Sequence, residues 1–245
     1  MEPIYVKNFT LDDLVVDRFG FLKPSAILYY VQEVAGQHFS LISRGQPSLE
    51  QQGLFWAVIR HRVQITRLPC KGETIRVETW PMPTTRTAYP RSVVAYDEEN
   101  REVFRSVCLW VLMDRNTRAM VLPGRSGVTV DGMIRGGELP SPGSLVPVGV
   151  GAEVVRRVCF TDLDVNGHMN NCRYMDWLAD LLPGEFHGSH CLRDFSLCYL
   201  SEAKEGDELP LGWEISPDGT LRLDIRRPVK DNFTRVFSAE LQFFD

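Results

Sequence analysis

The feature that most constrains this chain is a break rich in Gly and Pro at residues 132–151, GMIRGGELPSPGSLVPVGVG. Nine of its twenty residues are Gly or Pro, and regular helices or strands do not persist through such a stretch. We therefore expect a connector there. It separates residues 1–131 from residues 152–245, and each part is long enough to form a small domain.

The first part predicts one long helix and several strands. Residues 24–43 begin with Pro24 and Ser25 and contain no later Pro, as is typical of a helix and its start. This run is apolar nearly all round, which indicates a helix buried on most sides. Segments rich in Val, Ile and aromatic residues predict strands at residues 4–11, 55–66, 73–80, 91–98 and 102–114.

The second part repeats this order. Asn170 and Asn171 can start a helix that continues through Leu182 and is ended by Pro183-Gly184. Asp218-Gly219 is a hairpin signal between two of the strands. The predicted strands are residues 154–160, 195–201, 208–216, 220–229 and 234–244.

A direct alignment supports an internal repeat. DVNGHMNNCRYMDWL (164–178) lies over DRFGFLKPSAILYYV (17–31), with the Asp, the Gly and the start of the helix in register. SEAKEGDEL (201–209) lies over RLPCKGETI (67–75), with Gly206 on Gly72. Because each copy contains a strand, a helix and an antiparallel sheet, the sequence predicts an α+β fold built twice.

Composition excludes several classes of protein. The 245 residues are 44% hydrophobic, enough to bury a core, and the net charge of −5 argues against a basic nucleic-acid binder. The longest apolar run, residues 107–113, is too short to span a membrane. The N-terminus lacks a basic start followed by an apolar core, so we expect neither a membrane span nor a signal peptide.

The cysteines and histidines predict no special chemistry. The six cysteines form no Cys-x-x-Cys pair, which favours reduced, buried thiols in a cytoplasmic protein. His187 and His190 have a spacing that metal ligands use, but they lie in the loop-like segment GEFHGSHC without a strong further ligand. We therefore expect no metal and no cofactor.

Polar residues are concentrated in the segment FTDLDVNGHMNNCRYMDWL, residues 160–178. If the chain is extended there, Asp164, Asn166 and His168 alternate and project to one face. They would then converge just before a helix N-terminus, whose free N–H groups suit an oxyanion or a carbonyl oxygen. This pattern predicts a catalytic or binding site.

Part of this polarity has a structural explanation. Asp and Asn favour turns and helix caps, which is the favoured interpretation for Asp162 and an open one for the adjacent asparagine pair. The repeat argues for function elsewhere, because the positions that match Asn166 and His168 in the first part are Phe19 and Phe21. A requirement of the fold alone does not predict that asymmetry. It fits one active half and one half devoted to apolar packing or ligand binding.

Three segments resemble the acyl-acyl-carrier-protein (acyl-ACP) thioesterases of plants and bacteria. DLDVNGHMNNCRYMDWL resembles that family's D-L-D-V-N-x-H-V-N-N-x-x-Y motif. SVCLWVLMDRNTRAM (106–120) resembles its W-V-M-M-N-x-x-T-R-R strand, and RVETWPMPTTRTAYPRSVVAYD (76–97) its E-T-W segment with the Arg-containing strand that follows. The resemblance runs from about residue 4 to the end of the chain.

The resemblance implies two tandem hotdog folds, each a long helix wrapped by an antiparallel sheet. The first, residues 1–131, would bind the acyl chain and lack catalytic residues, and the second, residues 152–245, would be catalytic. The implied activity is hydrolysis of the thioester that holds a fatty acyl chain on the phosphopantetheine arm of acyl carrier protein. The implied partner is therefore that carrier, and both a monomer and a homodimer are allowed.

The resemblance also implies the site residues. The family's active-site Asp, Asn and His fall on Asp164, Asn166 and His168, and its catalytic Glu falls on Glu202. The Cys that follows this Glu in the family is Ala203 here, which counts against a cysteine acyl-enzyme. The position that matches Glu202 in the first part is Leu68, so that copy lacks the acid as well.

For the mechanism we expect water to be the nucleophile, activated by Glu202 directly or together with His168. Asn166 would position the water or bind the carbonyl oxygen, and Asp164 would orient its neighbours. Direct attack by Asp164 to give a mixed anhydride is the alternative.

Other functions and surfaces stay open at this point. An acyl-coenzyme A thioesterase would use the same chemistry, and a non-catalytic acyl-thioester-binding protein belongs to a different class. Hotdog dehydratases also pair a His with an acid, but no matching motif is visible. Residues 26–42, with Trp56 and Trp80, are candidate walls of an acyl slot or ordinary core. The basic runs 54–71 and 221–236 are candidate docking faces for an acidic carrier or simply solvated strand faces.

Overall fold

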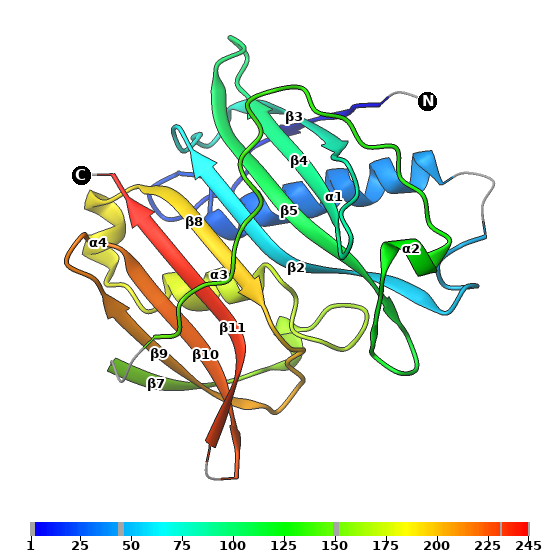
Figure 1. Ribbon diagram of the computed structural model, residues 1–245. Coiled ribbons are helices and arrows are strands. Elements are labelled where there is room, and N and C mark those ends of the chain that lie inside the picture. Colours follow the sequence, from blue (N-terminus) through cyan, green and yellow to red (C-terminus); the bar gives the residue numbers. More distant parts are fainter. Residues whose placement is uncertain (1–2, 44–46, 149–151, 231, 245) are drawn as a thin grey trace. The chain divides into compact units, whose positions relative to one another are not determined.

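The computed structural model describes residues 3–43, 47–148, 152–230 and 232–244 (Figure 1). The chain divides into two compact units. Unit 1 comprises Met1–Leu22 and Tyr29–Pro142, and unit 2 comprises Lys23–Leu28 and Gly143–Asp245. No helix of the described residues has both the length and the apolar character that a membrane crossing requires.

Unit 1 contains an antiparallel sheet. Its strands follow the order β1-β3-β4-β5-β2, and the short β6 pairs with the end of β5. The bounds are β1 Tyr5–Thr10, β2 Leu54–Ile65, β3 Thr74–Pro81, β4 Tyr89–Tyr96, β5 Glu102–Asp114 and β6 Met120–Val121. The short helix α2, Pro123–Ser126, follows β6.

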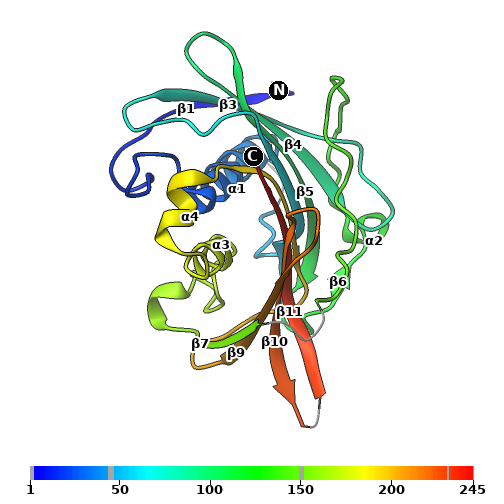
Figure 2. The same cartoon turned by 90° about the vertical axis from the view of Figure 1, so that its left-hand side faces the viewer.

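The long helix α1 spans Pro24–Ile42, which confirms the helix predicted from residue 24. Only Tyr29, Gly36 and Ser40 are exposed among its residues, and their spacing places them along one side of the helix. The prediction of burial on most sides is therefore confirmed. In Figure 2 the helix lies against one face of the unit 1 sheet, with its axis close to the line of sight.

The strands of unit 2 pair antiparallel in the order β8-β11-β10-β9-β7. The bounds are β7 Ala152–Arg157, β8 Leu192–Tyr199, β9 Glu208–Ile215, β10 Leu221–Val229 and β11 Asn232–Phe243. Helix α3, Arg173–Ala179, packs on this sheet through Tyr174, whose ring stacks on that of Phe237 at a centroid distance of 4.6 Å. Each unit thus combines a helix with an antiparallel sheet, which confirms the predicted α+β class.

The second predicted helix is too long, and the predicted loop after it is wrong. Helix α3 ends at Ala179 rather than Leu182, and Gly184–Ser189 form a further helix, α4. Pro183 precedes α4 in an extended conformation with φ −58° and ψ 148°. Because proline suits the start of a helix and restricts the residue before it, Pro183 here begins one helix as well as separating it from the last.

The connector forms no helix or strand over its described residues 132–148, but both sides of it are held. In unit 1 the N–H of Met133 donates to the carbonyl oxygen of Pro81, and the guanidinium of Arg105 binds the carbonyl oxygen of Gly137. In unit 2 the buried carboxylate of Asp224 accepts the N–H of Val148 at 2.9 Å. The connector is therefore fastened by side chains and backbone instead of by a sheet ladder.

Candidate active site

The polar segment of unit 2 folds as a tight turn. The N–H of Asp164 donates to the carbonyl oxygen of His168 at 2.7 Å, and Gly167 takes a left-handed φ of 74°. One oxygen of the Asp164 carboxylate accepts the N–H of Asn166 at 2.8 Å and that of His168 at 3.2 Å. The expectation of an extended segment is therefore wrong, because the carboxylate binds the backbone N–H groups of its own turn.

Unit 1 contains the same turn at the position that the repeat alignment predicts. One oxygen of the Asp17 carboxylate accepts the N–H groups of Phe19 and Phe21 at 2.9 and 3.0 Å. The N–H of Asp17 donates to the carbonyl oxygen of Phe21 at 2.8 Å, and Gly20 has a φ of 84°. The two copies of the repeat thus form the same hydrogen bonds in their turns.

A second turn lies beside the first in each unit. In unit 2 the N–H of Met169 donates to the carbonyl oxygen of Ala203 at 2.8 Å, and an isolated bridge joins His168 to Lys204. In unit 1 the corresponding bond runs from Leu22 to Pro69 at 2.9 Å, and the corresponding bridge joins Phe21 to Cys70. These bonds bring residues far apart in the sequence into one local site in each unit.

Of the two pairs of adjacent turns, the pair in unit 2 places a histidine beside a glutamate. Nε2 of His168 lies 3.1 Å from Oε2 of Glu202, a hydrogen-bond distance. His168 is 9% exposed as a residue, whereas the Glu202 side chain is 35% exposed, so the imidazole is held while the carboxylate can still reach solvent. Phe21 and Leu68 occupy the matching positions of unit 1.

Arg227 of β10 fastens the turn that carries Glu202. One of its terminal nitrogens donates to the carbonyl oxygen of Glu202 at 2.6 Å and to the carboxylate of Asp207 at 2.8 Å. The other lies 3.3 Å from the hydroxyl oxygen of Ser201. From the sequence, Arg227 was identified only as part of a basic run. Asp207 could have indicated a partner for an arginine, because it aligns with the acidic Glu73 in the first copy of the repeat.

Asn166 lies at the exposed tip of the turn. Its Nδ2 lies 3.4 Å from the second carboxylate oxygen of Asp164, a long hydrogen bond that leaves its amide easy to redirect. The structure thus joins Asp164 with Asn166 through the turn, and His168 with Glu202 through side chains. The four predicted residues all belong to unit 2.

Two N–H groups at the start of α3 are already bonded within the chain. The N–H of Cys172 donates to the side-chain oxygen of Asn170 at 2.9 Å, and that of Arg173 donates to its carbonyl oxygen at 2.9 Å. Asn170 therefore closes the turn that precedes α3. Asp162 is structural too, since its buried carboxylate accepts the N–H of Cys159 at 3.0 Å and pairs with Arg173 at 3.2 Å.

The predicted burial of the cysteines is wrong for Cys70, Cys159 and Cys191, which are exposed. Neither Cys172 nor Cys198 suits a nucleophile. Burial, together with nearby Asp176, raises the pKa of the Cys172 thiol to about 12, so it is protonated at neutral pH. Cys198 is buried and lies 3.6 Å from the carbonyl oxygen of Gly143. Ala203, where the resembling family carries its Cys, is fully buried.

The histidines considered as metal ligands are engaged elsewhere. Nε2 of His187 lies 2.9 Å from the carbonyl oxygen of Ala179, and the ring of His190 stacks on Phe186 with centroids 4.2 Å apart. The parts of the chain that the structure describes contain no cluster of three or more His, Cys, Asp or Glu suited to a metal.

Unit 1 holds a cavity of about 140 Å³ between α1 and the sheet. Its walls are largely aromatic and aliphatic: Gln32, Ala35, Gly36, Phe39, Trp56, Pro81, Tyr89, Pro90, Arg91, Trp110 and Val130. The predicted walls Phe39 and Trp56 are among them, with rings packed edge to face at 5.2 Å. Trp80 is not, and its ring lies instead under the guanidinium of Arg135.

The two basic runs are largely committed to contacts within their own units. In the first, Arg67 pairs with Glu73 and Asp97 at 2.7 and 2.9 Å. In the second, Arg222 pairs with Glu240 at 3.1 Å, and Arg235 lies 3.3 Å from the carbonyl oxygen of Leu145. These contacts favour the interpretation of both runs as structural strand faces over that of a free docking face.

Comparison with known proteins identifies relatives along the whole chain. Residues 2–122 match the model of the acyl-ACP thioesterase N-terminal domain, and residues 152–226 match that of the acyl-ACP thioesterase C-terminal domain. A palmitoyl-acyl carrier protein thioesterase, chloroplastic, of Gossypium hirsutum is 24% identical over 232 residues, covering 89% of this chain and 56% of that protein. The chain thus spans little more than half the length of such relatives.

Two solved structures share the fold at low identity. An acyl-ACP thioesterase of Bacteroides thetaiotaomicron superposes with a TM-score of 0.86 and 21% identity, covering 99% of this chain and 98% of that one. A 12:0-ACP thioesterase of Umbellularia californica gives a TM-score of 0.82 and 21% identity, covering 100% and 98%. These likenesses confirm the predicted fold of two tandem hotdogs.

Proposed function

This chain belongs to the acyl-ACP thioesterase family, and from that premise we propose that it hydrolyses the thioester of fatty acyl-ACP and releases the free fatty acid. The observation that carries the proposal is the pair of His168 and Glu202 in unit 2, with Nε2 and Oε2 3.1 Å apart. A partly exposed carboxylate beside a buried imidazole can activate water, and the matching positions of unit 1 hold Phe21 and Leu68 instead.

In the proposed reaction Glu202 is the general base. It takes a proton from water as the water oxygen attacks the thioester carbonyl carbon, while His168 fixes the carboxylate and shares the proton. The tetrahedral intermediate then collapses with cleavage of the C–S bond, and the proton returns to the departing pantetheine sulfur. The products are a fatty acid and the carrier with a free thiol.

We assign the remaining two residues to binding and support. Asn166, at the exposed tip of the turn, is positioned to donate its amide to the carbonyl oxygen of the substrate or to orient the water. Asp164 holds the turn. Its carboxylate binds the N–H groups of Asn166 and His168 as Asp17 binds those of Phe19 and Phe21, which favours support over covalent attack.

We assign acyl binding to the N-terminal half, residues 1–131, and catalysis to the C-terminal half, residues 152–245. The support is the asymmetry between the halves: the apolar cavity lies in unit 1, and the histidine–glutamate pair lies in unit 2. An apolar slot gains free energy from each methylene it removes from water, about 0.8 kcal/mol, so a slot of this kind can select chain length.

The proposed partner is acyl carrier protein bearing its acyl chain on the phosphopantetheine arm. Relatives of this chain are named as acyl-ACP thioesterases, including a dodecanoyl-[acyl-carrier-protein] hydrolase of Cinnamomum camphora that is 25% identical over 194 residues. An acyl-coenzyme A thioesterase is the alternative with the same site, and a non-catalytic acyl-binding protein is the alternative without turnover.

The test is a hydrolysis assay with matched substrates and matched variants. Acyl groups of several lengths are presented on acyl carrier protein and on coenzyme A to the wild type, to Glu202→Gln and to Glu205→Gln. Glu205 is an exposed acid in the same turn and is the control. We expect carrier-selective turnover that falls roughly 10²- to 10⁴-fold in Glu202→Gln and stays near wild type in Glu205→Gln.

Each other outcome has a defined meaning. Equal or faster turnover of the coenzyme A esters would move the protein to the coenzyme A alternative with the same chemistry. Full activity in Glu202→Gln would remove Glu202 from the mechanism. Tight binding of acyl thioesters without any hydrolysis would favour the binding-protein alternative.

A further inference from the structure

The cavity of unit 1 is lined by one positively charged side chain, Arg91, which an aliphatic chain can neither neutralise nor hydrogen-bond. Arg91 of β4 lines the cavity and is only 6% exposed. One terminal nitrogen of its guanidinium lies 3.0 Å from Nδ1 of His38 and 3.1 Å from the hydroxyl oxygen of Thr79. Neither partner is a carboxylate, and over the described residues no carboxylate pairs with Arg91.

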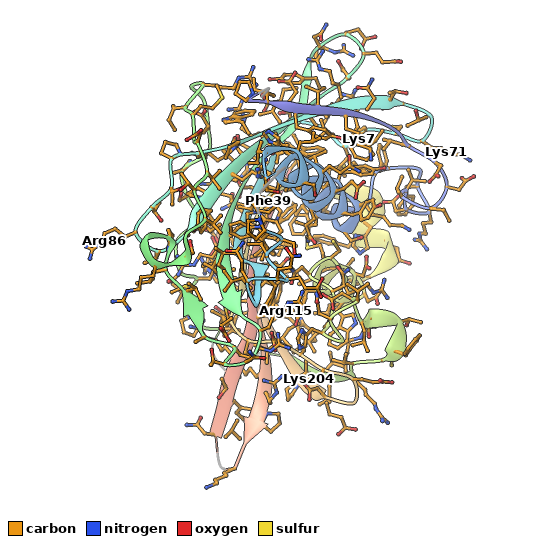
Figure 3. The ribbon with its side chains drawn as sticks, turned by 90° about the vertical axis from the view of Figure 1, so that its right-hand side faces the viewer. Lys7, Phe39, Lys71, Arg86, Arg115 and Lys204 are labelled. Carbon is orange, nitrogen blue, oxygen red and sulfur yellow. The ribbon has the colours of Figure 1, made fainter. Side chains whose placement is uncertain are left out.

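The position of these partners fixes where the guanidinium lies. His38 belongs to α1 and Thr79 to β3, so the group that bonds to both lies between the helix and the sheet. The cavity is lined by the same helix, through residues such as Ala35 and Phe39, and by the same sheet. Figure 3 labels Phe39, which projects from α1 into the interior of unit 1. The guanidinium is therefore part of the cavity wall.

A buried guanidinium without an anion is costly to maintain. Taking a charge out of water carries a free-energy penalty that neutral hydrogen-bond partners offset only in part. Burial accordingly lowers the pKa of Arg91 to about 10, so the group still carries its charge at neutral pH. Its planar fork offers five N–H donors, and one terminal nitrogen accounts for both side-chain bonds described above.

We propose that the unit 1 cavity is a binding site for a carboxylate attached to a short aliphatic chain, with Arg91 binding the carboxylate. Aromatic walls with one buried cation match an amphiphile that has an apolar body and an anionic end. Arginine binds carboxylates through two parallel hydrogen bonds, which a neutral alcohol of the same length does not reproduce. An apolar cavity of roughly 150 Å³ accommodates a molecule of about six carbons, so hexanoate is the matched probe for the 140 Å³ found here.

This site lies in the cavity to which we assign the acyl chain, so its fatty-acid ligand rests on the proposed function, but binding of a carboxylate there does not require turnover. A carboxylate reaches it either as a free fatty acid or as the far end of an acyl chain that carries a terminal carboxyl group. Free acid is the simpler source, because the proposed reaction releases one. Both sources share the chemistry that Arg91 recognises, and separate arms of the test distinguish them.

The experiment measures equilibrium binding of hexanoate, 1-hexanol and hexylamine at pH 7.5 by calorimetry and by tryptophan fluorescence. Trp56 and Trp110 line the cavity and report its occupation. We expect hexanoate to bind roughly 10-fold or more tightly than hexanol, and hexylamine to bind weakest. In Arg91→Met the preference for hexanoate over hexanol should disappear, while hexanol binding is kept.

Two further variants keep the test decisive. Arg105→Met removes an arginine of β5 that already pairs with Glu102 of the same strand, and it should leave the preference unchanged. Ala35→Leu adds volume to the cavity wall and should weaken all three ligands, which locates the site even if Arg91→Met fails to fold. Thermal unfolding establishes which variants are folded.

The contrary results are equally specific. Equal affinities for hexanoate and hexanol in the wild type, or an unchanged preference in folded Arg91→Met, would show that Arg91 only ties α1 to the sheet. Binding that Ala35→Leu does not weaken would place the ligand elsewhere. A comparison of two probes then assigns the source: hexanoate represents a free fatty acid, and adipate monoester represents an acyl chain that is esterified at one end and has a carboxyl group at the other. Equal binding of both would show that the site also accepts the terminal carboxyl group of an acyl chain, and binding of hexanoate alone would assign the free acid.

Discussion

The two turns that the repeat places at residues 17–22 and 164–169 share a backbone and differ in chemistry. Each is closed by an aspartate that accepts two N–H groups of its own turn, at 2.9 and 3.0 Å in unit 1 and at 2.8 and 3.2 Å in unit 2. Each has a glycine with a positive φ, 84° and 74°. Features present in both turns serve the fold, so only features confined to one turn are candidates for function.

That comparison divides the predicted site into two kinds of residue. Asp164 has a counterpart in Asp17 that accepts the same two backbone N–H groups, so we assign Asp164 to support of the turn. Asn166, His168 and Glu202 have Phe19, Phe21 and Leu68 as counterparts, and they are therefore the residues to which we assign the chemistry. Membership in a family motif therefore does not by itself make a polar residue a reacting group.

The largest effect is expected when His168 of the unit 2 turn is replaced by phenylalanine, the residue that unit 1 has at the matching position 21. His168→Phe removes the imidazole from Glu202 but keeps a side chain that the same backbone turn already accepts at Phe21. We expect kcat to fall roughly 10²- to 10⁴-fold with little change in Tm, as measured by steady-state hydrolysis and thermal unfolding. The control Phe21→His should leave kcat unchanged. An active His168→Phe would break the division between scaffold and chemistry.

A smaller effect is expected from the residue that positions Glu202. Arg227→Ala removes the bonds to the Glu202 carbonyl oxygen and to Asp207, and a shift of about 1 Å in a reacting group can cost 10²-fold. We expect kcat to fall roughly 10- to 100-fold with KM little changed, and Arg227→Lys to restore part of it. Arg222→Ala, on the same strand but paired with Glu240, is the control. Equal losses in the two alanine variants would indicate general damage to the sheet.

The two aspartates offer a matched pair that sharpens the comparison. Asp164→Ala and Asp17→Ala each remove a carboxylate that binds two backbone N–H groups. We expect each to lower the free energy of unfolding by about 1–2 kcal/mol, as measured with urea. Asp164→Ala should also lower kcat, but by less than Glu202→Gln. A loss of activity as complete as in Glu202→Gln, without loss of stability, would point to direct attack by Asp164.

The smallest effect is expected at Cys172, which lies at the start of α3 close to the turn. Burial raises the pKa of its thiol to about 12, so at pH 8 nearly all of it is the unreactive thiol. Cys172→Ala should therefore retain kcat within about threefold, and iodoacetamide should not inactivate the enzyme through this residue. Stoichiometric labelling of Cys172 that abolishes turnover would contradict this expectation.

Much of this arrangement could be predicted from the sequence, for identifiable reasons. The helix from Pro24 was predictable because proline at its start and an uninterrupted apolar run both indicate it. The repeat was predictable because a turn that needs a left-handed residue retains its glycine, as at Gly20 and Gly167.

Other features could not be read from the local pattern. The alternation of Asp164, Asn166 and His168 has the period of a strand, but the Asp164 carboxylate binds the backbone and closes a turn instead. The sequence around Pro183 is equally compatible with the end of one helix and the beginning of another. Glu202 was identified only through the resemblance, since its distance from His168 depends on tertiary pairing. Arg227 was missed because nothing in a basic run shows which arginine faces a carbonyl oxygen.

The central claim is that the carboxylates of unit 2 act on water and on the backbone, and not as nucleophiles. A single turnover in water enriched in oxygen-18, with enzyme in excess over acyl-ACP, tests it directly. The account predicts one oxygen-18 atom in the fatty acid released in this first turnover, and none in Glu202 or Asp164 by mass spectrometry of their peptides. An unlabelled fatty acid together with oxygen-18 in either carboxylate would demonstrate an acyl-enzyme anhydride and contradict the account.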